Sequence, residues 1–201
     1  MENKFVSVLT KEYTPPPIDR REALRYAGAR GADSATEALL EECITEAEGQ
    51  LRYSCVYCIL TKSELSQLLP YGGSELLSSR LAGCEGAMLL CATVGIGLDR
   101  LIAKYGSLSP ARALMLQALG AERIEALCDL FCRDMGEELS MKGMSLTPRF
   151  SPGYGDLPLS AQKEIFAILN CPKMIGLTLN ESLIMSPTKS VTAIIGIKNE
   201  D

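Results

Sequence analysis

The stretch Arg149-Phe150-Ser151-Pro152-Gly153-Tyr154-Gly155-Asp156-Leu157-Pro158 lies between a long helical pattern and a short one. Its prolines and glycines fix a tight backbone path, and Gly153 allows the main chain to approach a ligand closely. Arg149 offers a fork of donors that suits a carboxylate or a phosphate, and Tyr154 offers a flat face with a polar tip. The stretch predicts a stiff loop that holds a small polar ligand. The simpler interpretation is a connecting turn with a surface arginine.

Upstream of this loop, Ser109-Pro110 predicts the start of the longest helix, with a capping serine and a proline in the first turn. Apolar residues recur at steps of three and four, which predicts one buried face: Leu114, Ala118, Ala121, Ile124, Cys128, Phe131 and Met135. The two alanines indicate close packing of another element against the first half. Glu122, Glu125 and Asp129 follow the same rhythm on a neighbouring face. Glu125 is either solvated there or accepts hydrogen bonds from a ligand ammonium or hydroxyl.

The rest of the chain mixes helical and strand patterns without a regular alternation. Further helices are predicted at 18–27, 35–51, 74–82, from Gly97 to about Tyr105, and from a capping Ser160 to Leu169, where Cys171-Pro172 ends the helix. Strands are predicted at 51–60, 87–93, 183–185 and 191–197. This order favours an α+β fold with a mostly antiparallel, twisted sheet flanked by helices. We expect a single domain over residues 1–201, with residues 1–17 as an extended arm.

Composition and charge limit the classes of partner that we expect. Of the 201 residues, 47% are hydrophobic, and the net charge is −5 without any basic stripe, so nucleic acid is not an expected partner. The N-terminus opens no apolar run of the signal-peptide kind. The longest uncharged apolar stretch lies between Glu85 and Asp99 and is too short to cross a bilayer. We therefore expect a cytoplasmic protein without a membrane partner.

The chain contains no histidine. Histidine is the commonest metal ligand and the commonest general base, so these residues cannot supply a histidine-dependent triad, a histidine-containing zinc site or an imidazole for cobalt or haem iron. Any reaction that needs an imidazole must take it from a partner.

Eight cysteines are present, and most lie within apolar patterns, so we expect reduced thiols that act as small hydrophobic residues. Cys55 and Cys58 match the spacing of a redox pair, but a strand would direct them to opposite faces. Together with Cys128 and Cys132 they could form a four-thiolate zinc site, but the number of thiols is the only support for such a site. Gly95 and Gly97 follow a strand and precede a helix, and tight packing explains them better than phosphate binding.

Two C-terminal segments resemble a known family. Arg149-x-Ser151-Pro152-Gly153-Tyr154-x-x-x-Pro158 is similar to the RxxPGYxxxP signature of the activation domain of cobalamin-dependent methionine synthase. The segment from Leu179 to Val191, LNESLIMSPTKSV, is similar to that family's LTESFAMxPxxSV segment, and the spacing between the two also fits. A weaker match runs from Ser74 through Asp134.

The resemblance implies a methionine synthase activation-domain-like fold and a set of site residues. Arg149, Ser151, Gly153 and Tyr154 correspond to the family's S-adenosylmethionine-binding loop, and Glu125 corresponds to its helical acid. It also implies that S-adenosylmethionine is the cofactor and that a partner protein holds the cobalamin. The implied partners are a cobalamin-dependent methionine synthase or a related corrinoid protein, and a flavodoxin or ferredoxin-type electron donor.

Three functional hypotheses remain at this stage. The first is a stand-alone subunit that binds S-adenosylmethionine for the reductive remethylation of a partner's cobalamin and does not turn over alone. The second is a non-enzymatic docking or lid module for a corrinoid methyltransferase that no longer binds S-adenosylmethionine. The third is a thiol redox or zinc protein that uses Cys55, Cys58, Cys128 and Cys132.

Overall fold

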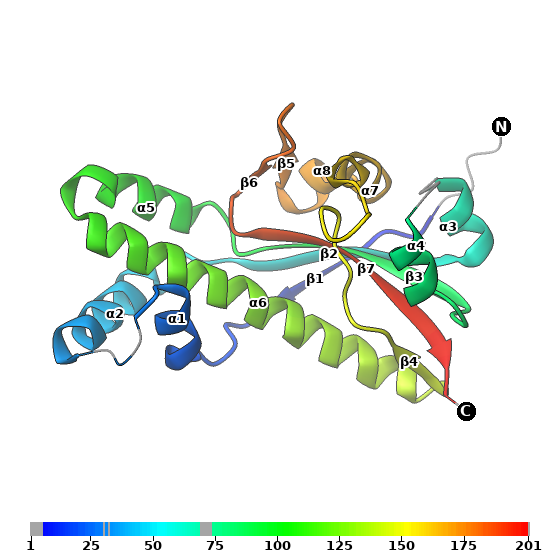
Figure 1. The fold of residues 1–201 in the computed structure, drawn as a ribbon, viewed down its shortest axis with the longest axis horizontal. Coiled ribbons are helices and arrows are strands. Elements are labelled where there is room, and N and C mark those ends of the chain that lie inside the picture. Colours follow the sequence, from blue (N-terminus) through cyan, green and yellow to red (C-terminus); the bar gives the residue numbers. More distant parts are fainter. Residues whose placement is uncertain (1–5, 30, 32, 69–73, 201) are drawn as a thin grey trace.

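The computed structural model describes residues 6–29, 31, 33–68 and 74–200. Its centre is a sheet of five strands in the order β1-β2-β3-β7-β4, and every neighbouring pair is antiparallel (Figure 1). The strands are β1 Leu9–Tyr13, β2 Tyr53–Thr61, β3 Gly86–Thr93, β4 Met144–Leu146 and β7 Ser190–Asn199; a separate pair joins β5 Thr178–Leu179 to β6 Met185–Ser186. The expected α+β class with an antiparallel sheet is confirmed. Residues 9–13 of the expected arm pair with β2 as an edge strand.

Helices cover both faces of this sheet and extend beyond one end of it (Figure 1). Their bounds are α1 Arg20–Tyr26, α2 Ser34–Ala47, α3 Lys62–Leu68, α4 Glu75–Arg80, α5 Gly97–Leu108, α6 Pro110–Ser140, α7 Gln162–Leu169 and α8 Cys171–Ile175. A 3-10 turn, Leu159–Ala161, precedes α7. Sequence patterns did not predict α3, α8 or the short strands β1, β4 and β5.

Helix α6 has two halves with different partners. The second half packs against one face of the sheet, where Ile124, Leu127, Cys128, Phe131, Met135 and Leu139 join inward residues of β2, β3 and β7. The first half runs beyond the sheet and packs against α1, α2 and α5. A side chain at Gly120 would place its Cβ 2.3 Å from Leu98 Cδ2, so α5 can approach closely there. The predicted close packing on this half is therefore confirmed.

Because the two halves of α6 pack against different elements, the buried face of the helix differs from the predicted one in the first half. Leu114, predicted as its first member, is 55% exposed, and Met115 and Leu116 are buried in its place. The steps of three and four predict one continuous stripe only if one surface lies along the whole helix. Here the sheet covers the second half and other helices cover the first.

Strand alternation separates the two cores. Val56, Cys58 and Leu60 of β2 join the core beneath α7 and α8, whereas Cys55 and Tyr57 face α6. Side chains two apart share a face of a strand, so Cys55 and Cys58 must lie on opposite faces. This confirms the expectation for that pair.

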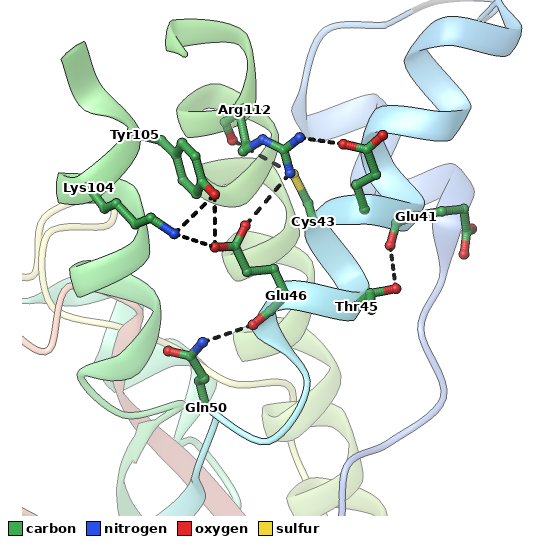
Figure 2. Close-up of polar contacts among 9 residues, drawn as sticks. Glu41, Cys43, Thr45, Glu46, Gln50, Lys104, Tyr105 and Arg112 are labelled. Carbon is green, nitrogen blue, oxygen red and sulfur yellow. Dashed lines mark hydrogen bonds and ion pairs between the residues drawn. The ribbon is translucent and has the colours of Figure 1, made fainter. Parts of the chain in front are cut away.

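Polar contacts hold the helical end together around Glu46 of α2 (Figure 2). The Glu46 carboxylate accepts hydrogen bonds from Lys104 Nζ at 2.8 Å and from the Tyr105 hydroxyl at 2.9 Å. Arg112 at the start of α6 lies 3.7 Å from the same carboxylate and also pairs with Glu42. These contacts join α2, α5 and α6 around an apolar cluster that includes Leu40, Leu98 and Leu116.

The predicted start of α6 at Ser109-Pro110 is confirmed, although the Ser109 side chain makes no capping hydrogen bond. Two other predicted helix boundaries are wrong in detail. Ser160 lies inside the 3-10 turn, so α7 begins only at Gln162 and has no side-chain cap. Cys171-Pro172 starts α8: Asn170 adopts a left-handed conformation with φ 48° that separates the two helices. Proline is tolerated in a first helical turn because its missing N–H would have no partner there.

Candidate functional site

The loop from Thr147 to Pro158, called here the signature loop, is fixed against strand β7. Phe150 and Ile194 exchange two backbone hydrogen bonds of 2.9 and 2.8 Å. Thr147 adds a backbone bond to Gly196 O, and its hydroxyl accepts the Gly196 N–H at 2.8 Å. The chain therefore leaves β4 along the edge of β7 and crosses towards α7 (Figure 1). Arg149 and Ser151 flank the bridged Phe150, so the sheet holds their backbone in place.

The second part of the loop is a compact turn. The Gly153 N–H donates to Leu157 O at 2.9 Å, and Gly153 has a φ of +91°, which an L side chain rarely adopts. Leu157 is buried. Asp156 accepts hydrogen bonds from the Ser74 hydroxyl and from the Glu75 N–H, at 2.7 and 2.6 Å, and ties the turn to the start of α4. Hydrogen bonding from Ser74 and from backbone N–H groups of α4 lowers the pKa of Asp156.

A pocket of about 900 Å³ opens beside this loop, a size within the range of ligand sites. Arg149, Ser151, Tyr154 and Glu125 all line the pocket, so the structure brings together four of the residues that the sequence singled out. Gly153 is not among its described lining residues and shapes the turn behind Tyr154. The other described lining residues come from α4, α6, α7, β4, β6, β7, the loop and the 3-10 turn after it: Arg80, Asp129, Cys132, Leu146, Thr147, Pro148, Phe150, Pro152, Leu159, Gln162, Met185, Ser190, Val191 and Thr192.

Arg149 is held by two carboxylates of α6. Its Nη2 donates to Glu125 Oε2 at 2.9 Å and to Asp129 Oδ1 at 2.8 Å. Residues four apart share a helix face, which explains why both acids reach one guanidinium. Burial works against the charged guanidinium, but the nearby Cys128 and Glu125 outweigh it, so the Arg149 pKa is raised. Glu125 thus accepts hydrogen bonds, and in this structure its partner is Arg149.

The wall of the pocket also presents one exposed aromatic side chain, Tyr154, and a second cation, Arg80. Tyr154 is 67% exposed. The Arg80 guanidinium carbon lies 4.9 Å from the centre of the Phe150 ring, within the range of a cation–π contact. Flat faces beside charged groups suit a ligand that combines an aromatic ring with a charged tail.

Four residues of this wall were not predicted as ligand-site residues: Arg80, Asp129, Cys132 and Gln162. The sequence placed Asp129 on the same helix face as Glu125, one turn later, and named Cys132 only as a possible zinc ligand. Gln162 carries a weaker signal, as a polar residue at the start of a helix whose other buried residues are apolar. Arg80 carries no signal, because it reaches the site only through the packing of α4.

The cysteines do not form a metal site in the described part of the chain, where no group of three or more suitable side chains converges. Cys58 lies on the opposite face of the sheet from Cys55 and Cys128, which separates the four thiols of the zinc hypothesis. All eight cysteines are free. Burial raises the pKa of Cys58 and of Cys128 to about 12 in each case, which disfavours a reactive thiolate.

Packing accounts for the glycine turn before α5. A side chain at Gly97 would bring its Cβ within 2.2 Å of Gln50 O, and Gly95 has a φ of +82°. Both positions therefore require glycine for steric or conformational reasons. Separately, none of the helices between residues 6 and 200 that the structure describes has the length and apolarity to cross a membrane.

Two comparisons with known proteins agree with this geometry. The fold is similar to a solved structure entitled "Crystal Structure of the MetH Reactivation Domain bound to AdoHcy", with a TM-score of 0.67 and 15% sequence identity; the match covers 96% of this chain and 79% of that chain. No curated protein matches the sequence. The family model described as "Vitamin B12 dependent methionine synthase, activation domain" matches residues 86–200, which hold α6, the signature loop and β7. The chain therefore belongs to the family of vitamin B12-dependent methionine synthase activation domains.

Proposed function

We propose that this chain binds S-adenosylmethionine in the pocket beside the signature loop and serves as a stand-alone reactivation subunit for a cobalamin-dependent methionine synthase. The observation that carries the proposal is the convergence of Arg149, Ser151, Tyr154 and Glu125 on one pocket. By the resemblance of the sequence motifs, Arg149, Ser151 and Tyr154 correspond to the family's ligand-binding loop and Glu125 to its helical acid. The structural neighbour was solved with AdoHcy, the demethylated form of that ligand, which supports an adenosyl-type ligand here as well.

The residues present fit such a ligand. Among the described residues, Arg149 pairs with Glu125 and Asp129 through Nη2, which leaves Nε and Nη1 as further donors. A guanidinium fork suits the carboxylate of an amino acid. Tyr154 is exposed and can cover an apolar or cationic face, including a sulfonium. Glu125 and Asp129 can also accept hydrogen bonds from an ammonium.

The chemistry itself would come from the ligand and the partner. S-adenosylmethionine, held by Arg149, Tyr154 and Glu125, would supply the methyl group and be left as S-adenosylhomocysteine. The partner's cobalamin, reduced by a flavodoxin or ferredoxin-type donor, would accept that group. The 201 residues contain no histidine, so any imidazole ligand of cobalt comes from elsewhere. This chain's own part is to position the methyl donor, and we expect no turnover without a corrinoid protein.

Calorimetric titration of the protein with S-adenosylmethionine tests the proposal. We expect saturable binding to the wild type and a loss of roughly one to two orders of magnitude in affinity for Arg149→Ala, because a hydrogen-bonded charge pair is removed. Arg100→Ala is the matched control: Arg100 is an exposed arginine of α5 that does not line the pocket in the described residues, and its loss should leave the affinity unchanged. Equal affinity in all three proteins would remove Arg149 from the site.

One observation favours a second candidate function. Arg149 is already paired with Glu125 and Asp129, so a ligand carboxylate has to share or displace them. If they hold too tightly, the chain would act as a docking or lid module for a corrinoid methyltransferase without binding S-adenosylmethionine. Retention of a corrinoid protein on the immobilised chain, equal with and without S-adenosylmethionine, together with no calorimetric signal, would support this function instead.

A further inference from the structure

Gln162, one of the residues that line the pocket, carries a buried and unpaired polar atom. Among the described residues, two buried side-chain oxygens lack a hydrogen-bond partner, and one of them is Gln162 Oε1. The residue lines the pocket and is only 4% exposed. Buried polar atoms are paired in the great majority of native proteins, because an unpaired one loses its hydration without compensation. The geometry therefore calls for a partner that the described residues do not provide.

The local packing does not explain why a glutamine stands here. Gln162 begins α7, and the other buried residues of that helix are Ile165, Phe166 and Leu169. Methionine has a similar length and volume and would fill this position without burying any hydrogen-bonding group. The unpaired amide oxygen therefore has a free-energy cost that packing does not offset, and a role in binding would account for it.

We propose that Gln162 recognises the adenine edge of the nucleoside part of the ligand; this inference rests on the proposed function. A primary amide presents an acceptor and a donor side by side in one plane. Adenine presents the complementary pair, its 6-amino group as donor and an adjacent ring nitrogen as acceptor, and amide side chains pair with it through two hydrogen bonds.

The amide can turn towards such a base at small cost. The terminal torsion of glutamine is broad and roughly two-fold, so the positions of its oxygen and nitrogen exchange easily. No described group holds Oε1, so its rotation breaks no hydrogen bond to that atom. Gln162 would thus read the base while Arg149 holds the carboxylate, and the two residues would act on different groups of one ligand.

The test uses nucleosides that lack the carboxylate, so that Arg149 does not contribute. Adenosine and purine riboside differ only in the 6-amino group that Gln162 would bind. Ligand-observed NMR titration should show that the wild type prefers adenosine by roughly ten-fold or more, the discrimination that one bidentate base contact supplies. Gln162→Met should abolish this preference and Gln162→Glu should reduce it, because a carboxylate retains the acceptor and loses the donor.

Urea denaturation shows whether a variant that loses the preference for adenosine is still stably folded. Gln162→Met removes the unpaired oxygen and should be at least as stable as the wild type, so a loss of preference in a stable variant reports on recognition. An unchanged preference in Gln162→Met, a wild type that binds both nucleosides equally, or a wild type that binds neither would overturn the inference. A wild type that prefers adenosine through Gln162 but does not bind S-adenosylmethionine would overturn the proposed function and leave this inference standing.

Discussion

Two arginines that pair with acids of α6 lie in opposite environments. The Arg123 side chain is 1% exposed and pairs with Glu122, which is 3% exposed. Its remaining donors reach the backbone carbonyls of Pro16 and Pro17 at 2.5 and 2.8 Å. Arg149 is 22% exposed, and its two acid partners, Glu125 and Asp129, are 43% and 75% exposed.

The difference separates a structural guanidinium from one that is available to a ligand. A buried charge is tolerated only when it is paired and hydrogen-bonded, and Arg123 meets that condition entirely within the protein. It thereby ties the segment before α1 to α6, where Glu122 also accepts the Asp19 N–H at 3.0 Å. The exposed partners of Arg149 can rotate into water, so this guanidinium can exchange them for a ligand.

The largest effect is expected at the buried pair. Arg123→Met leaves the Glu122 carboxylate buried without its partner, and breaking such a pair costs about 3–5 kcal/mol. Urea denaturation followed by circular dichroism measures the loss. The double variant Glu122→Leu with Arg123→Met removes both charges and should recover much of the stability. A loss below about 1 kcal/mol in the single variant would show that the pair is not structural.

The same substitution at the second arginine should leave the fold intact. Arg149→Met removes ion pairs whose acids are exposed, and such pairs contribute about 0–1 kcal/mol. The unfolding free energy should therefore change by no more than that, as the same urea titration measures. If Arg149→Met destabilised the protein as much as Arg123→Met, the contrast between the two guanidinium groups would be lost.

The contrast also shows what the sequence could predict. Arg149, Ser151 and Tyr154 were identified because their chemistry lies within one short loop, and a turn rich in glycine and proline can be interpreted locally. The antiparallel sheet followed from strand patterns that the pairing of β2, β3 and β7 confirmed. Those features depend on neighbours in the chain.

Features that depend on distant segments were not predictable in this way. Glu122 and Glu125 share one helical rhythm, yet Glu122 is buried and Glu125 lines the pocket. Glu122 accepts the Asp19 N–H, and its partner Arg123 donates to the Pro16 carbonyl; each of these contacts joins residues more than one hundred positions apart along the chain. The periodicity of α6 cannot show which of its acids such distant segments will bury. The roles of Arg80 and of the unpaired Gln162 oxygen could not be predicted for the same reason, since both depend on tertiary packing.

A smaller effect is expected in the alkylation rates of two thiols of α6, which extend the comparison between buried groups and groups at the pocket. Cys128 is buried, whereas Cys132, one turn later, lines the pocket. Burial raises the pKa of both, to about 12 for Cys128, so alkylation should be slow at pH 7 and accelerate as the pH rises. Mass spectrometry after brief iodoacetamide treatment at pH 8.5 should find Cys132 modified before Cys128. Modification of Cys128 first would show that the α6 face is not packed as described.

Ligand protection completes this measurement. Saturation with S-adenosylhomocysteine should slow the alkylation of Cys132, because the ligand would occupy the pocket that this thiol lines. Cys43, buried among α2, α5 and the start of α6, serves as the internal control and should react at the same slow rate with and without the ligand. Equal rates at Cys132 in both conditions would place the ligand elsewhere.

The smallest effect on stability is expected at Asp156. Its hydrogen bonds attach the signature loop to α4, and they can be tested independently of the ion pairs of Arg149. Hydrogen bonds from Ser74 and from backbone N–H groups of α4 lower the pKa of Asp156, so its contribution to stability is complete above the unfolded value of about 3.9. That contribution is lost as the pH falls through the lower folded value. Asp156→Asn should therefore flatten the decline of the urea midpoint between about pH 4 and pH 2. Parallel profiles would mean that Asp156 does not hold the loop, and the position of Arg149 would then rest on Phe150, β7 and the two acids of α6.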